Sequence, residues 1–481
     1  MRFNIIQRIL GLLLTLFSLT LVPPIVIALW TSDGALVAFA TAFVLTLFVG
    51  LVLWLPVRNQ RQELRLRDGF LIVVLFWAVL SISGAAPFAL TNHPQMAFTD
   101  AVFESMSGLT TTGATVITGI DTLPVSILYY RQQLQWLGGM GIIVLAVAIL
   151  PMLGIGGMQL YRAETPGPMK DNKLTPRITE AAKALWYIYL GMTVACAVAY
   201  WFAGMSVFDA ICHSFSTVAI GGFSTHDLSI GYFNNVLIES IAILFMITAG
   251  INFSLHFLAW RWHTLGPYSR DSEFKTYVLL LISVCAVSTI VLLSTGTGLE
   301  QAARQGIFQA ISIGTTTGFS TTSFQTWPGF LPVLLLFSSF VGGCAGSTGG
   351  GIKVIRLLLL VKQGIREIRR LIHPNAIIPI KVGGKPLPDR VVDAVWGFFA
   401  TYMATFTIML LALMATGLDQ VTAFSAVAAC INNLGPGLGD VGTHYGDTGA
   451  LAKWILSFAM LLGRLEIFTL LVLFTPSFWR S

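Results

Sequence analysis

Ten apolar stretches, most of them about twenty residues long, constrain this chain more than any other feature of its sequence. A helix of about 20 residues crosses the roughly 30 Å of hydrocarbon in a bilayer, so each stretch can span a membrane. Of the 481 residues, 55% are hydrophobic and 10% are charged, and the mean hydropathy is +0.78. The sequence therefore predicts an all-α integral membrane protein. The stretches are 9–30, 35–56, 69–90, 132–153, 182–204, 236–260, 276–295, 328–361, 391–416 and 451–475.

Lysine and arginine residues predict the orientation of the chain. They gather on one side of the membrane, before residue 9 and in segments 58–67, 162–183, 261–275 and 362–390. The positive-inside rule makes that side the cytoplasm and places the N-terminus there. The other side is acidic and favours cations, so the net charge of +6 reports topology and not nucleic-acid binding. Its acids are Asp100, Glu104, Asp121, Asp209, Asp227, Glu300, Asp419, Asp440 and Asp447, beside only Arg131, Arg304 and Lys453.

The first apolar stretch could be taken for a signal peptide, because it follows Arg2 and Arg8. It exceeds the usual apolar region of about 7 to 15 residues and lacks an A-x-A-like cleavage site. We interpret it as a retained helix.

A pattern of a short, half-apolar segment ending in a glycine-rich loop recurs four times after residue 60. The segments are 99–116, 206–225, 299–321 and 418–439, with central glycines Gly113, Gly222, Gly318 and Gly435. Each segment has an acid near its start, which suits a helix N-terminus, and Ser206 with Asp209 forms a capping-box pattern. Helices of about 10 to 14 residues cannot span a bilayer. We therefore expect re-entrant helices that enter from the acidic side and return as extended loops.

Four such loops at membrane depth need water or protein around their backbone. A shared aqueous pore meets this need, because a ring of carbonyl oxygens can replace the hydration shell of a large monovalent cation. Glycine reaches the dihedral angles that such a ring requires. The alternative is close helix packing, for which Thr, Ser and Gly are also used. Recurrence at four equivalent places favours the pore.

The motifs TTTGAT, AIGGFST, TTTGFST and NNLGPG, with GGCAGSTGGGIKVIR and GRLEIFTLL, resemble the Trk/Ktr/HKT superfamily of potassium transporters, most closely its bacterial TrkH type. The resemblance covers the whole chain. It implies two N-terminal helices followed by four pseudo-fourfold repeats of helix, re-entrant pore loop and helix around a central ion pore. The implied division is 1–60 for the two-helix domain and 61–153, 154–260, 261–363 and 364–481 for the four pore repeats.

The resemblance also implies a potassium selectivity filter with one glycine in each loop. Glycine in all four loops is associated in this family with a preference for potassium. Loops two and four depart from the TTTG wording, so their register stays open. The implied ion-binding residues are Thr111, Thr112, Gly113, Ile220, Gly221, Gly222, Thr316, Thr317, Gly318, Asn433, Leu434 and Gly435.

The glycine-rich segment 341–356 interrupts the second helix of the third repeat. A phosphate-binding loop needs G-x-x-x-x-G-K-[ST], but Lys353 stands one place late and no Ser or Thr follows, which excludes nucleotide binding. The resemblance implies an intramembrane loop that blocks the pore until it moves. The alternative is a kink or a close-packing helix face. The implied gate residues are Gly346, Gly349, Gly350, Gly351 and Arg464.

Arg464 stands near the middle of the last apolar stretch, where a charge usually faces water or a partner. The resemblance places it in the pore just below the filter, whereas the alternative is an ion pair with Glu466. We interpret WLGGMG (136–141) and TAGIN (248–252) as packing sites and His213 as a hydrogen-bonded neighbour. The five cysteines have no metal-type spacing and indicate small buried hydrophobes.

The predicted function is potassium uptake across a bacterial inner membrane, driven by the membrane potential. The chain needs no cofactor of its own, and potassium is the transported ion. The resemblance implies a homodimer and a cytosolic nucleotide-binding regulatory subunit of the TrkA kind. Segments 162–183 and 362–390 are candidate docking surfaces, although ordinary positive-inside charge explains them equally well.

Two other functions remain open. A carrier coupled to protons or sodium would need a titratable residue on the ion path, and the pore loops contain none. A membrane enzyme is the least supported, because no nucleophile-base pair or metal cluster stands at membrane depth.

Overall fold

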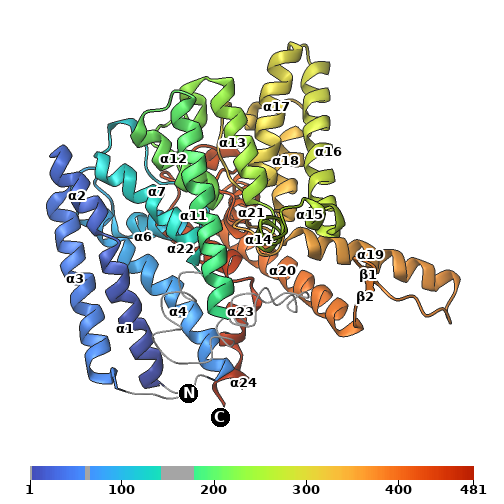
Figure 1. Cartoon of the computed structure of the whole chain (residues 1–481), viewed down its shortest axis with the longest axis horizontal. Coiled ribbons are helices and arrows are strands. Elements are labelled where there is room, and N and C mark those ends of the chain that lie inside the picture. The colour runs from blue at the N-terminus through green and yellow to red at the C-terminus, as the bar shows by residue number, and fades with distance from the viewer. Residues whose placement is uncertain (1–2, 60–64, 142–177, 481) are drawn as a thin grey trace.

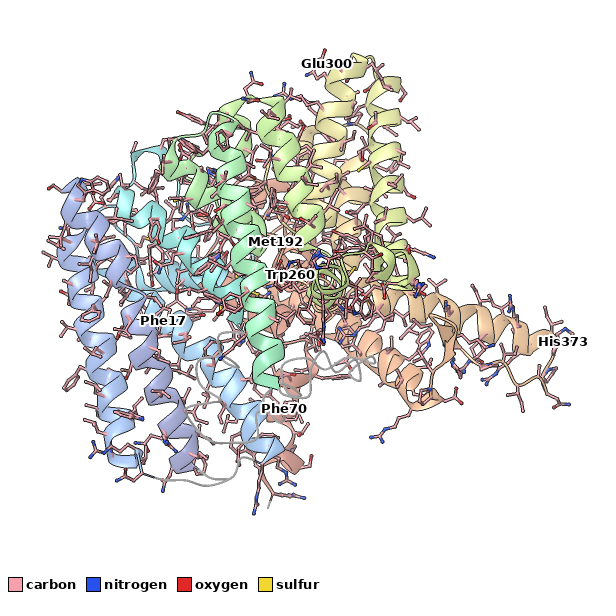
Figure 2. All side chains as sticks on the ribbon, in the orientation of Figure 1. Phe17, Phe70, Met192, Trp260, Glu300 and His373 are labelled. Carbon is pink, nitrogen blue, oxygen red and sulfur yellow. The ribbon has the colours of Figure 1, made fainter. Side chains whose placement is uncertain are left out.

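The computed structural model describes residues 3–59, 65–141 and 178–480 (Figure 1). These residues form helices joined by loops, with one two-stranded antiparallel hairpin. Both chain ends lie at one end of the molecule, which we call the basic face (Figure 1). We call the opposite end, where Glu300 lies, the acidic face (Figure 2). The architecture agrees with the predicted all-α class.

The elements keep the labels of Figure 1. They are α1 (Phe3–Leu19), α2 (Val22–Thr31), α3 (Leu36–Trp54), α4 (Leu66–Gly84), α5 (Ala86–Leu90), α6 (Phe98–Leu109), α7 (Val125–Gly139), α11 (Ile178–Phe202), α12 (Val207–Ala219), α13 (Val236–Ala249), α14 (Phe253–Trp262), α15 (Gly266–Arg270), α16 (Ser272–Ser294), α17 (Leu299–Gly314), α18 (Leu331–Val341), α19 (Val354–Ile372), β1 (Lys381–Val382), β2 (Lys385–Pro386), α20 (Asp389–Ala415), α21 (Gln420–Ile431), α22 (Ala450–Arg464), α23 (Phe468–Leu471) and α24 (Pro476–Trp479).

Among the described residues, six helical segments are long and apolar enough to cross a membrane, and two sharply bent helix pairs bring the number to eight. These eight match eight of the ten predicted stretches. Stretch 132–153 is described only as far as residue 141. Stretch 328–361 is divided between α18 and α19, as the glycine-rich segment predicted, and we call the intervening residues 342–353 the intramembrane loop.

Two helices that the sequence predicted as continuous are broken. α13 and α14 meet at 94°, so TAGIN is a helix break as well as the predicted packing site, where a Cβ on Gly250 would lie 2.2 Å from Oη of Tyr277. The reason is local, because Asn252 begins a new helix by accepting the N–H of Ser254 at 2.8 Å. α22 and the helical segment Phe468–Phe474 meet at 109°. Arg464 therefore ends a helix and does not lie in the middle of one, since Glu466 and Ile467 adopt left-handed φ angles of 54° and 47°.

Helix α7 begins seven residues before its predicted stretch, which started at residue 132. Its middle includes Arg131, Gln132, Gln133 and Gln135, all buried. These polar side chains face other parts of the protein and not lipid. The predicted stretch 132–153 contained the three glutamines but not Arg131 or the helical residues before it.

The four short helices are α6, α12, α17 and α21, with 12, 13, 16 and 12 residues. The third exceeds the expected length. Asp100, Asp209 and Glu300 lie in first turns, as predicted, while Asp419 is itself the N-cap of α21. Ser206 accepts the N–H of Asp209 at 3.0 Å, in agreement with the predicted capping pattern. Each short helix leads into an extended loop, and loops one to four follow α6, α12, α17 and α21 in that order.

Helices α19 and α20 form an arm joined by the β-hairpin. Figure 2 shows His373, just beyond α19, far from the rest of the molecule. One side of α19 exposes apolar residues, including Val361 at 52%, Ile368 at 63% and Leu371 at 84%. The same helix carries the basic residues Arg369 and Arg370 in its last turn. The arm is thus an amphipathic surface that the other described residues leave uncovered.

Helices α1 and α3 pack closely at two glycines. A Cβ atom at Gly11 would lie 2.6 Å from the backbone nitrogen of Trp54, and one at Gly50 would lie 2.7 Å from that of Thr15. No side chain fits at these distances, which is the usual reason for glycine where membrane helices approach closely.

We predict that Gly50→Ala will destabilise the protein by about 1 to 3 kcal/mol, because the added methyl group overpacks the α1–α3 contact. Thermal unfolding of the purified protein in detergent measures the change. Gly191→Ala, in α11, is the control, since nothing lies within 4 Å of a Cβ there. Equal melting temperatures for the two variants would contradict the prediction.

Candidate functional site

The four short helices end in the same hydrogen-bonded turn. In each, two successive loop N–H groups bond back to carbonyls of the last helical turn, the pair of bonds that defines a Schellman motif. The donor–acceptor pairs are Thr111–Gly108 with Thr112–Ser107, Ile220–Thr217 with Gly221–Ser216, Thr316–Ile313 with Thr317–Ser312, and Asn433–Cys430 with Leu434–Ala429. Helix C-termini carry a partial negative charge, so the motif sets four such ends at the start of the loops.

Equivalent positions in the four loops share unusual backbone angles. The residues two before the central glycines have φ of 56°, 56°, 68° and 53°, and are Thr111, Ile220, Thr316 and Asn433. The central glycines have φ of 80°, 79°, 85° and 96°. Asparagine tolerates the left-handed region, but threonine and isoleucine are strained there. Loops two and four therefore have the same register as loops one and three, which the motifs had left open.

The central glycines form a closed ring with carbonyl groups. A Cβ atom on Gly113 would lie 2.1 Å from the Gly221 oxygen, and one on Gly222 would lie 2.1 Å from the Thr317 oxygen. A Cβ on Gly318 would lie 2.2 Å from the Leu434 oxygen, and one on Gly435 would lie 2.7 Å from the Thr112 oxygen. Each glycine thus touches the residue that precedes the glycine of the next loop, and the fourth loop returns to the first. Any side chain at these positions would collide with the ring.

Gln135, which no sequence motif identified, supports loop two through hydrogen bonds to its backbone. Its Oε1 accepts the N–H of Phe223 at 3.1 Å, which orients the amide and directs Nε2 to the Gly221 carbonyl at 2.6 Å. One lone pair of that carbonyl is therefore already used inside the protein. A glutamine within the polar run 131–135 was the only signal in the sequence.

A buried ion pair joins loops one and two. Arg131 and Glu104 lie 2.8 Å apart and both side chains are 0% exposed. Glu104 accepts the N–H of Val116 in loop one, and Arg131 donates to the Ser224 carbonyl in loop two. Counting this pair among the charges of the acidic surface was therefore wrong, because the loops bury it. A buried charge needs such a partner, and removing one member leaves the other uncompensated.

The intramembrane loop bonds to the break between α13 and α14 and to the end of α12. The N–H of Cys344 donates to the Gly250 carbonyl at 2.9 Å, and the N–H of Phe253 donates to the Gly346 carbonyl at 3.0 Å. Thr348 donates its hydroxyl to the Val218 carbonyl at 3.0 Å. Backbone N–H and C=O groups that lack a helical partner at the α13–α14 break therefore bond to those that lack one in the intramembrane loop.

The same loop also bonds to the glycine ring. The N–H of Gly350 donates to Oγ1 of Thr316 at 2.7 Å, and the N–H of Gly351 donates to the Asn432 carbonyl at 3.1 Å. A Cβ on Gly350 would lie 1.9 Å from that carbonyl, so only glycine allows the approach. The loop therefore lies directly against loops three and four.

Arg464 joins the intramembrane loop to loop one. Its guanidinium donates to Oγ1 of Thr111 at 3.3 Å and to the Thr348 carbonyl at 3.4 Å, and also to the Gly138 carbonyl. Glu466, the alternative partner in the sequence analysis, pairs with Arg356 of α19. Arg464 therefore lies beside both the glycine ring and the intramembrane loop.

Comparison with known proteins gives the family. The sequence model of a family described as "Cation transport protein", TrkH, matches residues 35–481. The chain belongs to the TrkH family. It is 60% identical to the Trk system potassium uptake protein TrkH of Vibrio parahaemolyticus and 56% identical to that of Escherichia coli, over 100% of both chains in each case. A crystal structure of the potassium transporter TrkH from Vibrio parahaemolyticus matches with a TM-score of 0.91 and 57% identity, covering 100% of each chain.

Membership of the TrkH family confirms the predicted resemblance, the helical membrane fold and the prediction that the chain is a transport protein and not an enzyme. It also makes the chain a multi-pass membrane protein, in agreement with the apolar helices. The interpretation of His213 is confirmed, since its ring nitrogens lie 2.9 Å from the Asp209 carbonyl and from Ser224 Oγ. All five cysteines are free, and only Cys285 is not fully buried.

A second contact between loops one and two lies at the acidic face of this TrkH-family protein. His226 stacks on Tyr232 at 3.5 Å, and its Nδ1 lies 2.6 Å from Asp121. Its Nε2 lies 3.5 Å from Asp209. Partial burial opposes protonation of His226, but the hydrogen bonds and charges of Asp209 and Asp121 outweigh it and raise the pKa of His226 above its ordinary value. The contact is therefore strongest when His226 is protonated.

We predict that His226→Gln will lower the melting temperature in acid and not in base. A raised pKa contributes stability that is fully present below the ordinary histidine pKa of about 6.5 and disappears as the pH rises through the raised value. Thermal unfolding of both proteins between about pH 5 and about pH 9 spans this range. His373→Gln, at the exposed end of the arm, is the control. A difference independent of pH would contradict the prediction.

Proposed function

We propose that this chain takes up potassium across a bacterial inner membrane through a filter formed by loops one to four. The observation that carries the proposal is the closed ring in which each central glycine touches a carbonyl of the next loop. The relatives named as potassium uptake proteins support the same ion. We also propose that the chain divides into the two-helix domain and four pore repeats predicted from the sequence, with the loops as their shared centre.

The chemistry of the ring suits a large monovalent cation. Uncharged carbonyl oxygens replace the water of a weakly hydrated ion, and four helix C-termini add a negative potential without a fixed charge. The Gly221 carbonyl contributes one lone pair, since Gln135 uses the other. The proposed carbonyl ligands are those of Thr111, Thr112, Ile220, Gly221, Thr316, Thr317, Asn433 and Leu434, positioned by Gly113, Gly222, Gly318 and Gly435.

Charge placement supports inward movement. The acidic face, proposed as the outside, attracts cations. The basic face, proposed as the cytoplasm, holds both termini (Figure 1). A membrane potential of about 100 mV provides about 2.3 kcal/mol per elementary charge, enough to drive potassium inward without a second ion.

We propose that the intramembrane loop is the gate. It contacts loops three and four through Gly350 and Gly351, and Arg464 contacts both the loop and Thr111. Movement of the loop would have to release these bonds. Gly346 and Gly351, with φ of 76° and 77°, supply turns that keep it non-helical, and a Cβ on Gly349 would lie 3.1 Å from the Thr315 carbonyl. The positive charge of Arg464 below the ring would raise the barrier to cations while the loop is in place.

We also propose a homodimer and a cytosolic regulator. The exposed apolar residues of α19 would be buried against a second copy, because such a surface is unfavourable in water. The basic segment 362–390 lies on the proposed cytoplasmic side, where a nucleotide-binding subunit of the TrkA kind could dock. The other candidate docking segment, 162–183, lies outside the described residues as far as 177. The chain itself needs no cofactor.

A coupled carrier is the competing function. It would need a titratable group on the ion path. Within the described residues, no titratable side chain stands among positions 110–114, 219–223, 315–319 or 432–436, which form the ring. This composition supports uncoupled conduction.

Cation flux into proteoliposomes tests the proposal. The chain alone is reconstituted, and the uptake of potassium, rubidium, sodium and lithium is compared under an inside-negative potential. We expect potassium and rubidium to enter without a proton or sodium gradient. Flux that begins only when such a gradient is added would replace the proposal with the coupled carrier.

We predict that Gly318→Ser will reduce the preference for potassium over sodium by about tenfold, because the side chain would collide with the Leu434 carbonyl and deform the ring. The flux ratio in the same proteoliposomes measures it. Gly298→Ser is the matched control, since nothing lies within 4 Å of a Cβ there and serine suits the N-cap of α17. Unchanged selectivity in a folded Gly318→Ser protein would contradict the proposed filter.

We predict that Thr316→Val will raise basal potassium flux without the regulator, by about threefold to tenfold. Valine has the same shape but cannot accept the N–H of Gly350, and loss of one buried hydrogen bond costs about 1 to 3 kcal/mol. Thr326→Val is the control, because its hydroxyl donates to the local Ser323 carbonyl and not to the intramembrane loop. A Thr316→Val protein with wild-type basal flux would count against the loop as the gate.

A further inference from the structure

A buried glutamate at the start of α16 holds both ends of the intramembrane loop. Glu273 lies in the first turn of α16 and is 8% exposed. Its Oε1 accepts the N–H of Ala345 at 2.7 Å and the N–H of Ile355 at 3.0 Å. Ala345 lies near the beginning of the loop, and Ile355 lies just beyond its end. One oxygen atom therefore fixes the distance between the two ends.

The bond to Ile355 also caps helix α19. The first N–H groups of a helix have no partner within the helix, and a negative charge near them is favourable. The N-cap residue of α19, Lys353, makes no side-chain capping bond. Glu273 therefore supplies, from a different helix, the cap that α19 lacks.

A hydrogen bond of the adjacent residue, Ser272, connects the start of α16 to the exposed hairpin. Oγ of Ser272 accepts the N–H of Gly383 at 3.1 Å, in the turn between β1 and β2. The hairpin is tied to the arm, because Lys362 of α19 donates to the Lys381 carbonyl at 2.6 Å. Figure 1 shows the hairpin beside α19. The residue adjacent to Glu273 is thus connected to the part of the molecule that a cytosolic partner could reach.

The adjacent acid shows what an ordinary structural carboxylate does here. Asp271 accepts the N–H of Phe274 at 2.7 Å and so caps its own helix. Both of the bonds described for Glu273 go instead to the loop and to α19. Local helix stability does not require this arrangement. The two hydrogen bonds of Glu273 hold the intramembrane loop and not helix α16.

We propose that Glu273 is a positioning residue of the gate, which keeps the intramembrane loop in place by joining its two ends and transmits displacement of the arm to it through Ser272. Only one part of this inference, the opening of the ion path, rests on the proposed function of the loop as a gate. The position of the loop itself can be measured without transport.

Cys344 provides the measurement. This thiol lies in the loop next to Ala345 and is 1% exposed. Inside-out membrane vesicles containing the full chain are treated with N-ethylmaleimide, and labelling is quantified by peptide mass spectrometry. We expect Glu273→Ala to raise the labelling rate of Cys344 by about tenfold, because two buried N–H groups lose their acceptor. Cys430, buried in α21, is the internal reference and should stay unlabelled.

Two variants distinguish the loss of the hydrogen bonds that hold the loop from a general loss of structure. Glu273→Gln keeps an acceptor oxygen and should stay within about threefold of wild type. Glu300→Gln, an exposed glutamate in the first turn of α17, should change nothing. A folded Glu273→Ala protein with wild-type labelling of Cys344 would overturn the proposal, as would a glutamine variant labelled as fast as the alanine variant. Faster labelling without increased potassium flux would keep Glu273 as the holding residue and reject the loop as the gate.

Discussion

Every backbone group that leaves helical geometry at membrane depth needs a hydrogen-bond partner, and the structure depends on how those partners are found. The loops after the four short helices begin with Schellman bonds and then close on one another through the glycine ring. The intramembrane loop finds its partners at the break between α13 and α14, where Gly250 and Phe253 offer free groups. The described irregular segments of this site bond to or touch one another. Each is held by another irregular segment, which is why the ring and the loop form one unit.

Charged side chains at this depth connect those segments. Arg131 and Glu104 join loops one and two, Arg464 joins loop one to the intramembrane loop, and Glu273 joins the two ends of that loop. Such charges are costly when unpaired in a bilayer, so they are retained where they bond to several groups at once. Their partners are often backbone atoms far away in the chain, and this makes them sensitive to any movement of the loops. The proposed gating follows from this sensitivity.

Much of the fold could be predicted because its signals are local. Apolar length identified eight spans, Ser206 with Asp209 marked a helix start, and the glycines of 342–351 marked a broken helix. The sequence did not reveal the break at Gly250, because the residues on both sides are apolar enough to form one span. Gln135 and Glu273 were also missed. Their roles depend on N–H and carbonyl groups that are distant in sequence, and no local pattern identifies such partners. The four-repeat division of the chain remains a prediction.

The sequence by itself determined that the chain crosses a membrane many times, which side is basic, and where four glycine loops occur, since apolar length, charge and glycine spacing act within a few residues. Only the tertiary structure decided which carbonyl each glycine touches, that Arg131 and Glu104 are buried, and that Glu466 pairs with Arg356 and is not merely a neighbour of Arg464. These contacts join residues from different helices. Their geometry exists only once the helices have packed, because hydrogen bonds and ion pairs depend on distances that the chain alone does not specify.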